Sequence, residues 1–132
     1  MKKNCCLLFM SLVVILIMSS ESYAYREVLR GSFLENHKES IIVLDSKEDL
    51  SGTLSDLRIT KPETVDNFDF SREFLVLIIA SACPNPGYRI VAENIDFKDG
   101  RVNVKYKTER GPEGMMYAQV ISYPWLLAAV ER

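Results

Sequence analysis

The stretch from Phe74 to Ala82 constrains the fold of this chain more than any other feature, because it is apolar at every position except Ser81. It is too short to cross a membrane, which requires about 20 apolar residues. It also lacks the polar–apolar alternation of a strand that has one face in water. We therefore expect a central β-strand whose two faces are both covered by the rest of the molecule.

The segments before this strand indicate two strands and a helix. We expect an edge strand or lead-in segment over Tyr25–Leu34 and a short strand over Ser40–Asp45. Ser46 can cap a following helix, because its hydroxyl can accept a hydrogen bond from a free amide of the first turn. The helix should pack on the sheet through Leu50, Leu54 and Leu57, which recur on one helical face.

The segments after the central strand indicate further antiparallel strands. Asp99-Gly100 is typical of a type I′ hairpin turn and should join strands over Tyr88–Phe97 and Arg101–Lys107. Two short strands, Tyr117–Tyr123 and Trp125–Val130, are expected to close the chain, with Pro124 as the break between them. The pattern predicts an α+β fold: a small, mostly antiparallel β domain with one short helix packed on the sheet.

Residues 1–24 have the features of a cleavable secretory signal. These features are the basic residues Lys2 and Lys3, the apolar run Cys5–Met18, and small residues at Ser22 and Ala24. We expect cleavage between Ala24 and Tyr25, which would leave residues 25–132 as a single exported domain without a membrane anchor. An uncleaved N-terminal anchor is the alternative. Whether the product would be periplasmic, secreted or held at the cell surface is left open.

The composition expected after cleavage favours some functions over others. Loss of Lys2, Lys3 and Glu21 changes the net charge from −2 to −3, so no basic excess favours nucleic acid. Cys83 becomes the only cysteine, which excludes an internal disulfide and leaves its role open. With His37 as the only histidine, no zinc site or cofactor motif is visible, and no signature supports a Cys83–His37 catalytic pair. We expect a non-enzymatic protein without a metal or cofactor, and a monomer on its own.

From Phe70 onward the chain resembles the C-terminal domain of the PrcB-like family, proteins associated with the stability of an exported bacterial protease complex. The resemblance is strongest over residues 69–132. It rests on Asp69-Phe70-Ser71, the strand Phe74–Ile79, the turn Pro84-Asn85-Pro86-Gly87-Tyr88, and Tyr123-Pro124 before an apolar end. Asn85 and Pro86 depart from the usual family turn, which reads Pro, Thr, Gly, Gly, Tyr. The resemblance implies an accessory protein that engages or stabilises an exported protein such as a protease.

Three segments are candidates for contact with such a partner. Asn85-Pro86-Gly87-Tyr88 could form a rigid presenting loop, with Pro86-Gly87 in a type II turn that requires a positive φ at Gly87. The alternative is a purely structural turn in which Tyr88 starts a strand. Met115 and Met116 could supply an adaptable contact surface, or straddle the sheet with one side chain inside. Trp125 could be an interface anchor or a core residue.

The same segments also permit a second hypothesis, a peptidase inhibitor. Segments 84–88, 111–116 and 123–125 follow the order of the three inhibitory loops of chagasin-like inhibitors, which read Asn-Pro-Thr-Thr-Gly-aromatic, a Gly-rich loop and Arg-Pro-Trp. This sequence lacks the two threonines and has Tyr123 in place of the arginine. The identity of any partner is not encoded in these motifs.

Overall fold

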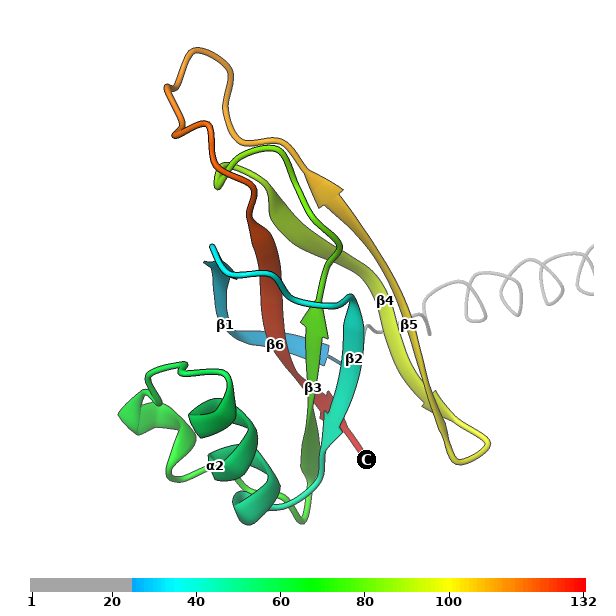
Figure 1. Ribbon diagram of the computed structural model, residues 1–132. Coiled ribbons are helices and arrows are strands. Elements are labelled where there is room, and N and C mark those ends of the chain that lie inside the picture. Colours follow the sequence, from blue (N-terminus) through cyan, green and yellow to red (C-terminus); the bar gives the residue numbers. More distant parts are fainter. Residues whose placement is uncertain (1–24) are drawn as a thin grey trace, which may run out of the picture.

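A computed structural model describes residues 25–132, which form two antiparallel β-sheets and two helical segments (Figure 1). The larger sheet has the order β1-β6-β3-β2 and the smaller sheet is a β4–β5 hairpin. The elements are β1 (Tyr25–Phe33), β2 (Ser40–Leu44), helix α2 (Lys47–Asp56), 3₁₀ helix η1 (Glu63–Val65), β3 (Glu73–Ile79), β4 (Arg89–Lys98), β5 (Arg101–Glu109) and β6 (Tyr123–Glu131). The predicted signal over residues 1–24 and its cleavage point lie outside the described residues.

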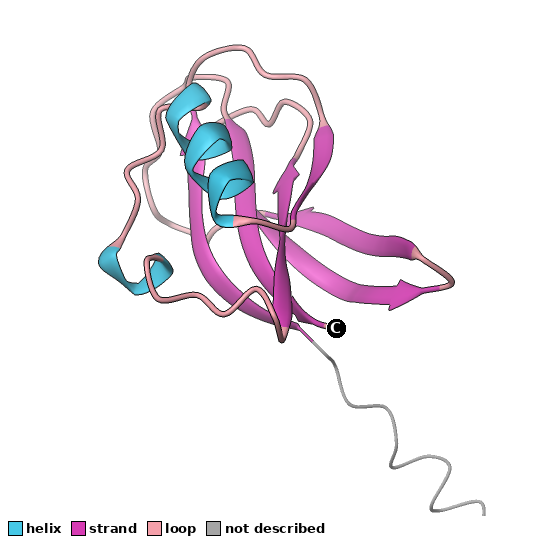
Figure 2. Cartoon of the chain, turned by 90° about the horizontal axis from the view of Figure 1, so that it is seen from below, coloured by secondary structure: helices cyan, strands magenta, loops and turns pink. Residues whose placement is uncertain are grey.

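Strand β3 is central and covered on both faces, so the main prediction from the sequence is confirmed. It pairs with β2 on one side and β6 on the other, and all its residues from Phe74 to Ile79 are buried. Leu75, Leu77 and Ile79 pack in a cluster with Leu50 and Leu54 of α2. Phe74, Val76 and Ile78 pack in a second cluster with Ile90 and Ile95 of β4. Figures 1 and 2 show α2 on one face of the sheet and the hairpin on the other.

The predicted α+β class is therefore confirmed, and the hairpin adds a third layer. Tyr25 of β1 donates a hydrogen bond to the carbonyl oxygen of Ala92 in β4 at 2.5 Å. Asp99 and Gly100 have φ values of 55° and 73°, as a type I′ turn requires at both central positions. Among residues 25–132, no helix is long and apolar enough to cross a membrane.

Helix α2 begins and ends on identifiable hydrogen bonds. The Ser46 hydroxyl accepts from the amide of Asp49 at 3.1 Å, as the cap prediction required. At the other end Arg58 adopts a left-handed φ of 56°, and the amide of Ile59 donates to the Leu54 carbonyl at 2.9 Å. The amide of Arg58 also donates to the Ser55 carbonyl at 3.1 Å. These two bonds at the C-terminal end form a Schellman motif, which normally has glycine at the left-handed position. The sequence lacks the usual glycine signal for this end, because Arg58 occupies that position.

The closing segment corrects the sequence analysis, because β6 is one strand that runs through Pro124. Residues 117–121 are irregular, Ser122 makes an isolated bridge, and the strand starts at Tyr123. Pro124 is tolerated because it lies near the start of β6, beside the point where β3 has already ended at Ile79. Its carbonyl still accepts from the amide of Ala80 at 2.9 Å.

Tyr106 of β5 links the hairpin to Glu39, directly before β2, and should make the stability of the fold depend on pH. Burial, followed by a hydrogen bond to the Glu39 carboxylate, raises the pKa of Tyr106 from 10.0 to about 12. The folded protein therefore holds this proton more tightly than the unfolded chain. The resulting stabilisation should be present below pH 10 and lost as the pH rises from 10 through about 12.

We expect Tyr106→Phe to remove the highest-pH step in an ultraviolet titration of tyrosine ionisation and to flatten the alkaline loss of stability. Denaturant unfolding between neutral pH and pH 12 measures the second effect. An unchanged alkaline slope in the Phe variant would contradict this role of Tyr106.

Candidate functional site

The β3–β4 and β5–β6 connections meet at one end of the molecule (Figure 1, top). Cys83 and Ser122 exchange two backbone hydrogen bonds of 2.8 and 2.9 Å. The Ser122 hydroxyl donates to the carbonyl oxygen of Asn85 at 2.8 Å. Asn85 and residues 111–115 line one common pocket, so the structure brings together two of the three segments that the sequence singled out. We call residues 84–88 and 110–121 the loop end.

Tyr117 organises the loop end, although the sequence analysis gave it no role. Its half-buried ring lies so close to Gly87 and Gly111 that a Cβ atom built on either glycine would collide with it. At Gly87 the nearest ring atoms would be 2.7 Å away, and at Gly111 the carbonyl oxygen of Gly87 would also be only 2.8 Å away. Two shallow pockets of about 380 and 290 Å³ share Gly87, Arg89 and Tyr117 in their linings.

The predicted type II turn at Pro86-Gly87 is wrong. Positive φ values among glycines occur at Gly100 and Gly114 within residues 25–132, and not at Gly87. The turn instead uses the Asn85 side chain, whose Oδ1 accepts from the amide of Gly87 at 2.8 Å. Gly87 is required because the Tyr117 ring packs against it, and this long-range contact leaves no local signal. Tyr88 lies directly before β4 and is half-buried, as the structural alternative expected.

Both methionines of the second segment are exposed, so the expectation that they straddle the sheet is wrong. Met115 is 61% exposed and Met116 is 99% exposed, because this segment is a loop outside any strand. The Tyr117 hydroxyl lies 3.8 Å from the sulfur of Met115. Val120 and Ile121, in the same connection, are also exposed. The loop end therefore presents four apolar side chains to solvent.

Trp125 belongs to the core, which confirms the core alternative and leaves little of its side chain for a partner. It is 7% exposed, packs in the cluster with α2, and stacks on Phe33 with ring centroids 6.0 Å apart. A Cβ on Gly31, its cross-strand partner in β1, would lie 2.6 Å from the indole ring. Aromatic side chains often cover a strand glycine in this way. The third inhibitory loop expected of a chagasin-like protein therefore does not present its tryptophan.

Arginines border the pockets beside Tyr117. Arg89 forms an ion pair with Glu109 at 3.7 Å, and Arg30 is paired with Glu27. Arg110 lines the larger pocket, is exposed, and forms no ion pair with any residue between 25 and 132. The loop end thus combines exposed apolar side chains with a cationic group that is available to a partner.

Cys83 and His37 occupy different environments. Cys83 is buried, its thiol donates to the carbonyl of Ser81 at 3.6 Å, and burial raises its pKa. A raised pKa opposes formation of the thiolate that a nucleophile requires. His37 stacks on Phe33 with centroids 4.0 Å apart. No group of three His, Cys, Asp or Glu side chains in the described part of the chain could hold a metal ion.

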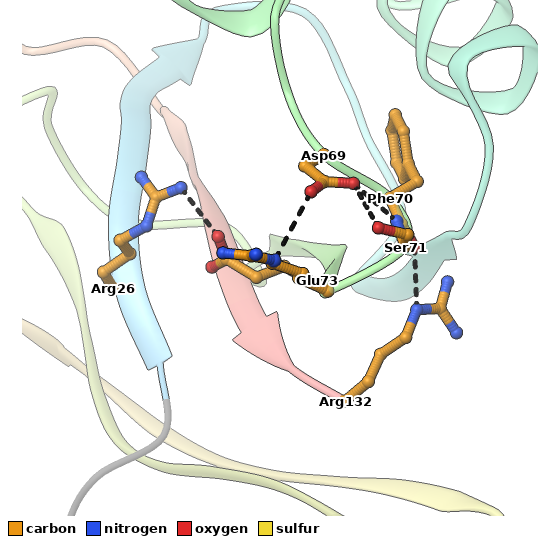
Figure 3. A network of polar contacts seen from close by, with 7 residues as sticks. Arg26, Asp69, Phe70, Ser71, Glu73 and Arg132 are labelled. Atoms are coloured by element: carbon orange, nitrogen blue, oxygen red, sulfur yellow. Dashed lines mark hydrogen bonds and ion pairs between the residues drawn. The ribbon is translucent and has the colours of Figure 1, made fainter.

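The Asp69-Phe70-Ser71 motif is a structural turn before β3 (Figure 3). The amide and hydroxyl of Ser71 both donate to the carboxylate of Asp69, at 3.0 and 2.5 Å, and hold the pKa of that carboxyl below its usual value. Arg132 donates to the carbonyl of Phe70 at 2.8 Å, so the turn is tied to the residue after β6. These contacts assign the motif a role in folding.

Comparison with known proteins identified one region of similarity. Residues 74–131 match the family model described as PrcB C-terminal. No curated protein and no solved structure matches the chain. The matched region runs from β3 to β6 and includes both segments of the loop end, whereas β1, β2 and α2 lie outside it.

Proposed function

Because the chain carries a PrcB-like C-terminal domain over residues 74–131, we propose that it is an exported, non-enzymatic accessory protein that binds an exported partner through its loop end. The partner proposed is a protease, which the protein engages or stabilises. The export step rests on the signal-like features of residues 1–24, with cleavage between Ala24 and Tyr25.

One observation carries the proposal: two connections that are distant in sequence form a fixed platform with apolar side chains on its surface. The platform is held by the Cys83–Ser122 bridge and by Tyr117 packed on two glycines. Apolar residues that are exposed together at one end of a small domain are typical of a protein–protein contact. Methionine suits such a surface, because its flexible thioether adapts to irregular partners.

The Cys83–His37 pair, considered from the sequence as a nucleophile and its base, gives no support to a catalytic role. Cys83 lies in the support of the platform with a raised pKa, and His37 is stacked on Phe33. The loop end gives a partner apolar contact area through Met115 and Met116, together with the charge of Arg110.

The test uses the chain produced by its own cells with an affinity tag after Arg132. The proposal expects an intact mass that starts at Tyr25, and capture of an exported protease from the same cell fraction. It also expects the double variant Met115→Asp/Met116→Asp to lose that protease by about tenfold or more, as for central contact residues.

Phe97→Asp provides the matched control, because Phe97 is a 53% exposed apolar residue near the end of β4. Figure 1 shows the β4–β5 turn at the opposite end of the molecule from the loop end. The Phe97→Asp variant should capture the protease as the unmodified chain does. The methionine variant should melt close to the unmodified chain, whereas Phe97→Asp should melt somewhat lower, because the Phe97 ring packs edge-on against Phe74 with centroids 5.7 Å apart. Retention of residues 1–24, or equal capture by the methionine variant, would count against the proposal.

A further inference from the structure

Strand β2 forms one edge of the larger sheet and, apart from its short length of five residues, lacks the devices that normally protect such an edge. It pairs with β3 on one side, and no strand among residues 25–132 pairs with its other side. Exposed edges attract further strands, and proteins usually protect them with charged residues, proline or a bulge. The β2 sequence, Ser-Ile-Ile-Val-Leu, contains none of these, and its pairing with β3 is regular.

The opposite edge of the same sheet is protected in the expected way. β1 has a bulge between Glu27 and Leu29, and it carries the charged residues Arg26, Glu27 and Arg30. The outer edge of β5 likewise carries Arg101, Lys105 and Lys107. Of these three edge strands, β2 is therefore the most open to pairing with an added strand.

The side chains of β2 alternate in a way that leaves an apolar contact surface at this edge. Leu44 is buried and Ile42 packs against the α2-side cluster. Ile41 and Val43 point to the other face and are 48% and 46% exposed. An added strand would pair with the free edge and could cover these two side chains through residues opposite them.

The charges at the two ends of β2 indicate what kind of strand fits. Glu39 and Asp45 are exposed and flank β2 directly outside its bounds, Ser40–Leu44. Continuing the two-residue alternation by one residue at each end places them on the face of Ile41 and Val43. Glu39 accepts a hydrogen bond from Tyr106, and Asp45 is paired with Arg132. Antiparallel pairing of two copies centred on Ile42 would place Glu39 of one copy opposite Asp45 of the other, which is unfavourable at both ends.

We propose that β2 is a strand-addition site for an extended segment of the partner protein, with basic residues at both ends of a short β-branched stretch. The backbone groups of the edge would supply affinity, as in other strand-addition complexes, and Ile41, Val43 and the two acidic residues would select the sequence. This inference rests on the proposed function, because the segment would belong to the protein that the loop end engages.

The experiment measures binding of a fluorescent peptide, Lys-Ser-Val-Thr-Ile-Ser-Lys with blocked termini, to the full chain. In antiparallel pairing its lysines lie opposite Glu39 and Asp45 and its Val and Ile lie opposite Val43 and Ile41. We expect saturable anisotropy, and binding at least about tenfold weaker for the peptide with glutamate in place of both lysines. Val43→Lys should weaken binding of the lysine peptide to a similar degree, because a lysine on the edge strand blocks strand addition.

Val120→Lys is the matched control, because Val120 is 43% exposed but lies in the loop end. It should bind the peptide as the unmodified chain does. Equal binding by Val43→Lys, no saturable binding at all, or a dimer in light scattering that Val43→Lys dissociates would each overturn the proposal. Peptide binding tests the β2 site, whereas protease capture by the methionine variant tests the loop end. Either proposal can therefore fail while the other holds.

Discussion

Replacing Leu127 with alanine is expected to lower the free energy of unfolding by about 2–5 kcal/mol. Leu127 is fully buried at the middle of β6, between Leu29 of β1 and Leu77 of β3. It belongs to the cluster under α2, so its loss would leave a cavity that neighbouring strands cannot fill. Small domains are stable by only about 5–15 kcal/mol, so the variant would lose a large part of its stability.

The neighbouring substitution Leu126→Ala tests whether the hairpin truly covers the second face. Leu126 points away from α2 and is 3% exposed in the cluster with Ile90 and Ile95. The Leu126→Ala variant should therefore lose about as much stability as the Leu127→Ala variant. Val120→Ala, at an exposed position, should change stability by less than about 0.5 kcal/mol. Denaturant unfolding of the three variants measures these losses. A small effect of Leu126→Ala would contradict the packing of the hairpin on the larger sheet.

Gly111→Ala is expected to destabilise the protein by about 1–3 kcal/mol, the usual range for overpacking. The new Cβ would collide with the Tyr117 hydroxyl and lie 2.8 Å from the carbonyl oxygen of Gly87, which is backbone and cannot rotate away. Gly87→Ala should be less damaging, because the nearest atoms to its Cβ belong to the Tyr117 side chain.

Thermal unfolding of double variants, each glycine substitution combined with Tyr117→Ala, separates the collision with the Tyr117 ring from the collision with the Gly87 backbone. Removal of the ring should relieve Gly87→Ala and leave most of the loss caused by Gly111→Ala. Gly52→Ala serves as the control, because nothing lies within 4 Å of its Cβ position in α2 and alanine favours a helix by about 0.5–1 kcal/mol. Harmless substitutions at both Gly87 and Gly111 would show that Tyr117 does not pack on them.

Local patterns predicted most of the strands and the helix because their signals lie within the elements themselves. The run from Phe74 to Ala82, the cap at Ser46 and the turn at Asp99-Gly100 are each readable over a few residues. The closing segment differs from its prediction because the effect of Pro124 depends on where β3 ends beside it, which the local sequence does not show. β4 and β5 form a separate sheet that covers the face of the larger sheet opposite α2. This arrangement depends on contacts between distant segments, and the hydrophobic periodicity of the sequence does not indicate it.

The sequence indicated only part of the candidate site, because the rest depends on contacts between segments that are distant in the chain. The turn at 84–88 and the methionine segment carry local signals, and the structure places Asn85 and Met115 in the lining of one pocket. Tyr117 and the requirement for glycine at positions 87 and 111 follow from packing between two connections, so no short motif marks them. Trp125 was ambiguous because tryptophan serves both interfaces and cores, and only its contact with Gly31 and Phe33 assigns it to the core.

Hydrogen exchange of the chain, measured alone and with its captured partner, tests the central claim most directly. Amide exchange reports protection segment by segment, so it identifies the binding surface without a substitution. Binding through the loop end predicts slower exchange over 84–88 and 110–121 and unchanged exchange in α2. Unchanged exchange throughout the loop end, with protection confined to the α2 face, would contradict the account.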